Sequence, residues 1–113
     1  MIFPPLPYYL FPYQPVPRQY PEANVPRMQA SARAYQQLIP QAENLTAKIQ
    51  SDAGFDRRLN QAAQVNHQDE VKRLVGTVVQ APFHVSYTPD GLKVEIYPQN
   101  QQACTILTVY VCW

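Results

Sequence analysis

The chain has 113 residues, which on the usual domain size allows one folded unit and excludes a large multidomain protein. Nine Lys and Arg against eight Asp and Glu give a net charge of +1, so the composition offers no basic surface for nucleic acid. Charged residues make up only 15% of the chain, against about 25% in ordinary soluble domains, and 14 Gln and 5 Asn take their place, so association with copies of itself becomes an option to test.

Export and membrane signals are missing from the sequence. No apolar run approaches the roughly 18 residues needed to span a bilayer, and the start Met1-Ile2-Phe3-Pro4 lacks the basic segment of a secretory signal. We therefore expect a protein made in the cytoplasm without a signal peptide and without a membrane partner. Two Cys are too few for a secreted disulfide scaffold, although one bridge or crosslink is compatible with them.

Residues 1–27 predict an extended arm that is rich in Pro and Tyr. They hold 8 of the 12 prolines and 4 of the 8 tyrosines, and each Pro removes a backbone donor and favours extended geometry before it. Three interpretations stay open: a disordered tether, a ligand for SH3 or WW grooves through Pro4–Pro7 and Pro12–Pro15, and an arm whose aromatic rings pack into neighbouring subunits. The candidate arm contacts are Phe3, Tyr8, Tyr9, Phe11, Tyr13 and Tyr20.

Three helices are predicted after the arm, at residues 28–50, 54–65 and 67–79. The first has one apolar stripe at helical spacing, with Pro40 expected to bend it or to divide it in two. The turn Ser51-Asp52-Ala53-Gly54 is expected to supply a cap for the second helix, and Asn66 to cap the third. The stripe consists of Met28, Ala32, Tyr35, Ile39, Ala42, Leu45 and Ile49.

A β-hairpin is predicted from strands at residues 83–88 and 91–97. Pro89 at the second turn position and Gly91 at the fourth fit a type I turn in which the glycine is left-handed. If Tyr87 pairs with Leu92, all apolar side chains of both strands lie on one face.

Residues 103–112 predict a third strand with two apolar sides. Leu107, Val109 and Val111 would face the helices. The opposite side carries Cys104, Ile106, Tyr110 and Cys112, which is unusual for a water-facing surface, so we expect something to cover it. These four residues are the candidates for assembly and crosslinking.

The expected fold class is therefore α+β, with two to three helices packed on one face of a three-stranded antiparallel meander. Residues 28–113 would form this single domain, and residues 1–27 the arm before it.

The two cysteines cannot pair within a straight strand. Eight residues at roughly 3.3 Å each separate their Cα atoms by about 26 Å, whereas a disulfide requires about 4.4 to 6.8 Å. Either both are buried thiols that act as small apolar groups, or they link different chains.

Catalysis and cofactor binding are not expected. His67, His84 and the two Cys lack the spacing of a zinc site. Ser86 or Cys104 with His84 is accompanied by no nucleophile elbow or acidic dyad, and three glycines form no phosphate loop. The sequence therefore predicts no enzyme, no metal, no cofactor and no small-molecule substrate.

Five segments of the chain form a recognisable series. They are the Pro/Tyr-rich start Pro4 to Tyr20, Ala62-Ala63-Gln64, Asp69-Glu70-Val71-Lys72-Arg73-Leu74-Val75, Thr88-Pro89-Asp90-Gly91, and Cys104-Thr105-Ile106-Leu107-Thr108-Val109 before the final Trp113. In these segments, and so over nearly its whole length, the chain resembles the YuzC-like family of small inner spore-coat proteins from endospore-forming Bacillus-type bacteria.

That resemblance implies a structural protein of the spore coat, made in the mother-cell cytoplasm, without catalysis or cofactor. Together with the doubly apolar last strand it favours a self-associating protein, whose partners are copies of itself in an oligomer, fibre or lattice and other coat proteins. The alternative is an adaptor whose Pro-rich arm is bound by a partner domain.

Overall fold

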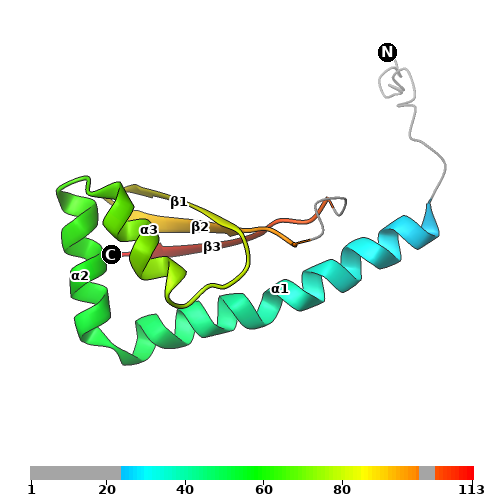
Figure 1. The fold of residues 1–113 in the computed structure, drawn as a ribbon, viewed down its shortest axis with the longest axis horizontal. Helices are drawn as coiled ribbons and strands as arrows, with labels where there is room; N and C mark the ends of the chain where they lie inside the picture. Colours follow the sequence, from blue (N-terminus) through cyan, green and yellow to red (C-terminus); the bar gives the residue numbers. More distant parts are fainter. Residues whose placement is uncertain (1–23, 100–103) are drawn as a thin grey trace, which may run out of the picture.

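The computed structural model describes residues 24–99 and 104–113 (Figure 1). The predicted arm contacts from Phe3 to Tyr20 lie outside the described residues. In the described part, three helices precede a three-stranded antiparallel sheet of order β1-β2-β3, which confirms the predicted α+β class. The elements are α1 (Val25–Ser51), α2 (Ala53–Gln64), α3 (Gln68–Gly76), β1 (Phe83–Thr88), β2 (Gly91–Ile96) and β3 (Leu107–Cys112).

Helix α1 begins at Val25, three residues before the predicted start at Met28. The side chain of Asn24 caps it by accepting a hydrogen bond from the Arg27 amide at 3.0 Å. Pro26 lies in the first turn, where no backbone donor is required, so it favours the helix. Pro40 lies inside α1 without dividing it, so of the two alternatives for this stretch the single helix is the correct one.

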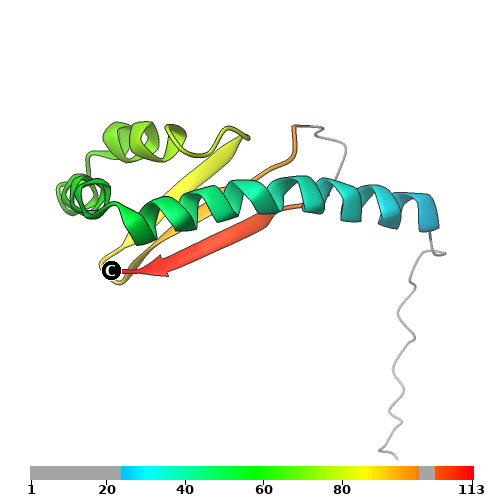
Figure 2. The same ribbon diagram turned by 90° about the horizontal axis from the view of Figure 1, so that it is seen from below.

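The buried side of α1 differs from the predicted apolar stripe. Ala34, Leu38 and Leu45 are its buried residues, whereas Met28 is 66% exposed and Tyr35 is 40% exposed. The first turns of α1, which contain Met28, project beyond the ends of the strands and have no sheet to pack on (Figure 2). Tyr35 directly follows the buried Ala34, so it is exposed because it lies on another side of the helix. Periodicity alone cannot show where a supporting layer ends.

The predicted cap of α2 is confirmed. The carboxylate of Asp52 accepts a hydrogen bond from the Phe55 amide at 3.0 Å. It also forms an ion pair with Lys48, whose Nζ lies 2.8 Å from Oδ2. These contacts, with Lys48 the larger cause, hold the pKa of Asp52 below its usual value. Both charged groups are exposed by more than a third, so water screens the ion pair and the cap bond contributes most.

We therefore expect Asp52→Ala to lower the free energy of unfolding by about 1 kcal/mol, the usual value of a lost N-cap. Because the pKa of Asp52 is lowered on folding, the carboxylate contributes stability above the ordinary carboxyl pKa, and this stability is lost as pH falls through the folded-state pKa. Urea unfolding at pH 7 and in acid should show the difference from wild type shrinking in acid. Ser51→Ala, one residue earlier and exposed, is the control and should change little.

The predicted cap of α3 by Asn66 is wrong. His67 occupies the N-cap position without a side-chain hydrogen bond, and Asn66 instead has a positive φ of 53° in the turn that follows α2. Asparagine tolerates this left-handed conformation better than most residues. Its Oδ1 accepts a hydrogen bond from Tyr87 Oη at 2.8 Å, so Asn66 joins this turn to the sheet.

The hairpin register is confirmed: Tyr87 pairs with Leu92, Val85 with Val94, and Phe83 with Ile96. The conformation predicted for Gly91 is wrong, because no glycine in the described residues has a positive φ. Gly91 pairs with Thr88 across a two-residue turn and also faces β3. A Cβ atom there would lie 2.6 Å from Tyr110 Oη and 2.7 Å from the Val111 carbonyl oxygen, so glycine is needed for close approach.

One hydrophobic core joins the helices to the sheet. The helix-facing side chains of the central strand β2 are buried in it. On the two edge strands only Val85 of β1 is buried, whereas Phe83, Tyr87 and the helix-facing side chains of β3 are half-buried. The largest fully buried side chains are Phe55, Leu45, Leu92, Ile96, Val71, Val75, Val79 and Val94.

Candidate assembly surface

The outer edge of β3 pairs with no other strand of the described residues. The Tyr97 amide donates to the Pro82 carbonyl at 2.8 Å, and the Trp113 amide donates to the Asp90 carbonyl at 3.2 Å. Because bonded and non-bonded pairs alternate along antiparallel strands, these two bonds assign the peptide groups of Leu107, Val109 and Val111 to β2. The peptide groups at even positions from Ile106 to Cys112 therefore point away from the sheet.

The side of β3 that faces away from the helices is apolar and exposed. Ile106 is 52% exposed and Tyr110 is 53% exposed. Next to Tyr110 on this face lies Lys93 of β2, and next to Thr108 lies Glu95. No described element covers Ile106 or Tyr110, so the covering that the sequence led us to expect is absent from the described part of the chain.

Both cysteines are free and exposed, at opposite ends of this edge. Cys112 is the last residue of β3, whereas Cys104 lies three residues before the strand, so β3 is shorter than the predicted 103–112. Burial of both thiols, one of the two alternatives for them, is therefore excluded.

The segment before β3 is tied to the start of α1. Arg27 Nη2 donates a hydrogen bond to Cys104 Sγ at 2.8 Å, and this contact raises the pKa of Arg27. One turn later, Ser31 Oγ lies 2.7 Å from Thr105 Oγ1, which also donates to the Ser31 carbonyl at 3.2 Å. Thr105 is 6% exposed. Sequence reasoning missed these contacts, although Arg27 and Ser31 lie on one helix face at a spacing of four.

Trp113 follows β3 at the end opposite Cys104 and joins it to the turn between β1 and β2. The sequence indicated it only as the end of the last strand. Its indole Nε1 donates to the Thr88 carbonyl at 3.1 Å, and its ring is 40% exposed. Hollows of about 580 Å³ and 440 Å³ flank the ring, the first lined also by Cys112 and Asp56. Asp56 Oδ1 is buried there without a hydrogen-bond partner, and burial raises the pKa of this carboxyl.

Comparison with known protein families shows which family the chain belongs to. The family model described as "YuzC spore coat inner layer protein" matches residues 25–107, well over half of the chain. The chain belongs to the YuzC family of spore coat inner layer proteins. The matched segment runs from the first residue of α1 to the first residue of β3. No curated protein and no solved structure matches the chain.

Membership of the YuzC family confirms the resemblance drawn from the sequence and places the protein in the spore coat. It indicates a structural role, in association with other coat components, since the family is one of coat proteins and not a known enzyme family. No helix of the described residues combines the length and the apolar character needed to cross a bilayer.

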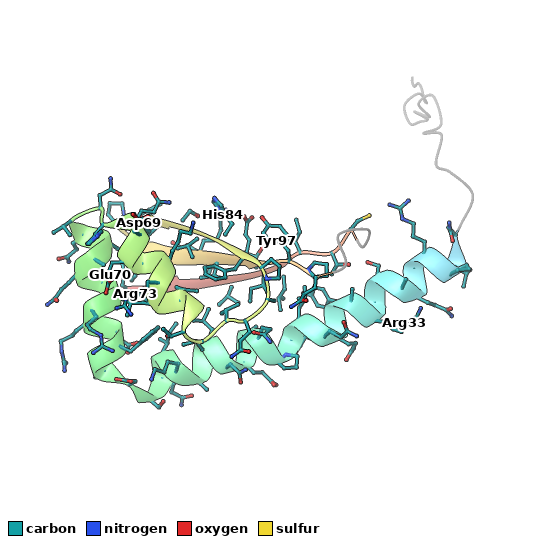
Figure 3. All side chains as sticks on the ribbon, viewed as in Figure 1. Arg33, Asp69, Glu70, Arg73, His84 and Tyr97 are labelled. Carbon is teal, nitrogen blue, oxygen red and sulfur yellow. The ribbon has the colours of Figure 1, made fainter. Side chains whose placement is uncertain are left out.

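The histidines named as potential metal ligands lie apart from the cysteines. His84 is an exposed residue of β1, with Nδ1 3.7 Å from Glu95 Oε1, and His67 lies before α3. Figure 3 shows His84 and Tyr97 separated from Asp69 and Glu70 of α3. Within residues 24–99 and 104–113, no three His, Cys, Asp or Glu side chains gather as a metal site would require.

Tyr97 contacts the same carboxylate as His84. Its Oη donates a hydrogen bond to Glu95 Oε1 at 3.4 Å. Burial, and after it the negative charge of Glu95, raises the pKa of Tyr97.

Proposed function

We propose that this protein is a self-associating structural component of the inner spore coat, in which the folded unit pairs through β3 and the N-terminal arm contacts neighbouring subunits. Copies of the chain are its first partners, and other coat proteins its further ones. The single observation that carries the proposal is the edge strand β3, whose outward peptide groups pair with no other described strand, with Tyr110 and the preceding Ile106 more than half exposed beside them.

Proteins that stay monomeric protect such an edge. Common devices are charged side chains, proline, a bulge or a covering loop, because an open edge is a template for another strand. Residues 104–113 contain no charged residue, no proline and no glycine. Their run of β-branched and aromatic side chains has high strand propensity. This composition supports pairing with another chain rather than contact with water.

The low charge of the chain supports the same role. With charged residues at 15% and a net charge of +1, long-range repulsion between copies is weak. The arm adds six aromatic residues, whose rigid rings bury a large area at little cost in side-chain entropy.

The mass of the full chain in reducing buffer tests the proposal, since disulfides then play no part. We expect a concentration-dependent mass above the 13.0 kDa of one copy at micromolar concentration, measured by sedimentation equilibrium. A 13.0 kDa particle at every concentration up to the millimolar range would contradict it.

Two arm variants separate the proposed subunit contacts from the adaptor alternative. One replaces the six arm aromatics by serine, and the other replaces Pro4, Pro7, Pro12 and Pro15 by alanine, which removes both PxxP segments and keeps the rings. We expect the aromatic variant to form smaller assemblies than wild type, and the proline variant to resemble wild type. Equal assembly by all three chains would argue against arm contacts between subunits.

A further inference from the structure

The positions of the two cysteines along β3 indicate how two copies would pair, provided that the protein self-associates as proposed. We propose that two copies pair antiparallel through β3 about a two-fold axis at Thr108, so that Cys104 of each copy lies opposite Cys112 of the other and both pairs form disulfides. The partner is a second copy of this chain, and the product is a continuous six-stranded sheet.

Hydrogen bonding along β3 permits this register. The two bonds that fix the ladder, Tyr97 to Pro82 and Trp113 to Asp90, leave the peptide groups of even-numbered residues pointing outward. In an antiparallel pair of identical strands, outward groups bond only when even positions face even positions. An axis at Thr108 fulfils this condition, because residues equally distant from Thr108 face each other.

The cysteines single out Thr108 among the permitted axes. Cys104 and Cys112 lie four residues before and four residues after it, so one rotation brings both unlike pairs together at once. Within one copy they are about 26 Å apart along the strand direction. Cys104 lies three residues before β3, so the proposed pairing extends the strand to residue 104. Each unlike pair is then a hydrogen-bonded pair with Cα atoms about 5.5 Å apart, inside the range that a disulfide accepts.

Side chains in this register are compatible with one another. Ile106 faces Tyr110 of the second copy, so the two exposed apolar residues cover each other, and Thr108 faces Thr108. A two-fold axis brings two identical edges together, so an edge whose charges are all of one sign would repel its copy. Residues 104–113 carry no charge, so no like charges meet.

Both thiols are accessible for this chemistry. Cys104 and Cys112 are free and exposed. Cys104 lies before the ladder with β2, but the next residue, Thr105, is hydrogen-bonded to Ser31 of α1, so the approach to the second copy requires Cys104 itself to move. On pairing, Cys104 Sγ loses its hydrogen bond of 2.8 Å from Arg27 Nη2 and bonds to Cys112 Sγ of the second copy. Each bond forms when two thiols lose two protons and two electrons to a low-molecular-weight disulfide, which is reduced to two thiols.

Complementary single-cysteine variants of the full chain test the register. Wild type, Cys104→Ser, Cys112→Ser and an equilibrated equal mixture of the two variants are oxidised with glutathione disulfide at micromolar concentration and separated under denaturing, non-reducing conditions. We expect a covalent dimer for wild type without a ladder of larger species, because the two-fold pair uses both thiols of each copy. Each variant alone should give monomer, and the mixture about half the wild-type dimer.

The outcomes separate this inference from the proposed function. Dimers of either single variant at the wild-type rate, a ladder from wild type, or no crosslink in the mixture would overturn the Thr108 register. If the mass in reducing buffer still exceeds one copy, self-association stands and only the register fails. If that mass is that of one copy, the proposed function fails as well. Peptide mapping of the wild-type dimer should find Cys104 joined to Cys112 and no like pairs.

Discussion

Replacing Gly91 by alanine is expected to lower the free energy of unfolding by about 2 to 3 kcal/mol, at the upper end of the cost of overpacking. The new Cβ would lie 2.7 Å from the Val111 carbonyl oxygen and 2.6 Å from Tyr110 Oη. Tyr110 can rotate away, but Val111 is backbone within the β2–β3 ladder, so relief requires β3 to shift. Urea unfolding monitored by circular dichroism measures the effect.

Gly76→Ala is the matched control for this substitution. Its Cβ would lie 3.7 Å from the nearest atom of the Phe83 ring, which is an ordinary contact, and Gly76 has no positive φ. Alanine at the end of α3 should therefore leave stability unchanged or raise it slightly, since it has the better helix propensity. Equal losses for both substitutions would show that close approach is not the reason for glycine at position 91.

The second large effect is expected for Thr108→Lys, which should weaken pairing through β3 and leave the fold intact. Two lysines would face each other across the two-fold axis, about 5 Å apart at Cβ. Their ammonium groups are on flexible stems and screened by water, so their repulsion should cost about 1 kcal/mol, and the dissociation constant should rise about 5-fold. Position 108 is exposed, and its cross-strand neighbour in the same chain is Glu95, so the single copy accommodates the new charge.

His84→Lys is the control, because His84 is the other cross-strand neighbour of Glu95, on the opposite edge of the sheet. It adds the same charge beside the same carboxylate and should leave the mass of the assembly unchanged. Sedimentation equilibrium of both variants in reducing buffer gives the comparison, with thermal unfolding to verify the fold. A normal assembly of Thr108→Lys would exclude pairing through β3 with Thr108 on the two-fold axis.

The sheet could be predicted well because two local signals agree there. The turn residues Pro89 and Gly91 and the alternation on both sides point to one register, which the structure has. The conformation of Gly91 could not be predicted in the same way. Its constraint comes from Tyr110 and Val111 on a strand that is distant in sequence, and turn chemistry carries no information about that strand.

The helices show the same division between local and tertiary information. A cap within Ser51-Asp52-Ala53-Gly54 was predicted because short polar side chains and the following apolar spacing suffice, and the structure identifies Asp52 as the capping residue. The buried side of α1 depends on which face of the helix packs on the core and on where the sheet ends, so Tyr35 and Met28 were wrongly placed in the apolar stripe. Asn66 was misassigned because a capping residue is also a residue that tolerates positive φ.

For the assembly surface, the sequence predicted which side chains share a face of β3 but not how its backbone is bonded. Strand alternation was enough to group Ile106 with Tyr110 and to separate the two cysteines. The links from Arg27 to Cys104 and from Ser31 to Thr105 join residues more than 70 positions apart, so only the folded chain reveals them.

Amide hydrogen exchange of the full chain, followed by NMR at increasing concentration in reducing buffer, tests most directly whether the β3 edge is the pairing surface. The amides of Val109 and Val111 bond to β2 and should be protected at every concentration. The outward amides of Thr108 and Tyr110 should exchange rapidly in dilute protein and become protected as the mass of the particle rises. Rapid exchange of both outward amides in a sample whose mass exceeds one copy would contradict pairing through β3.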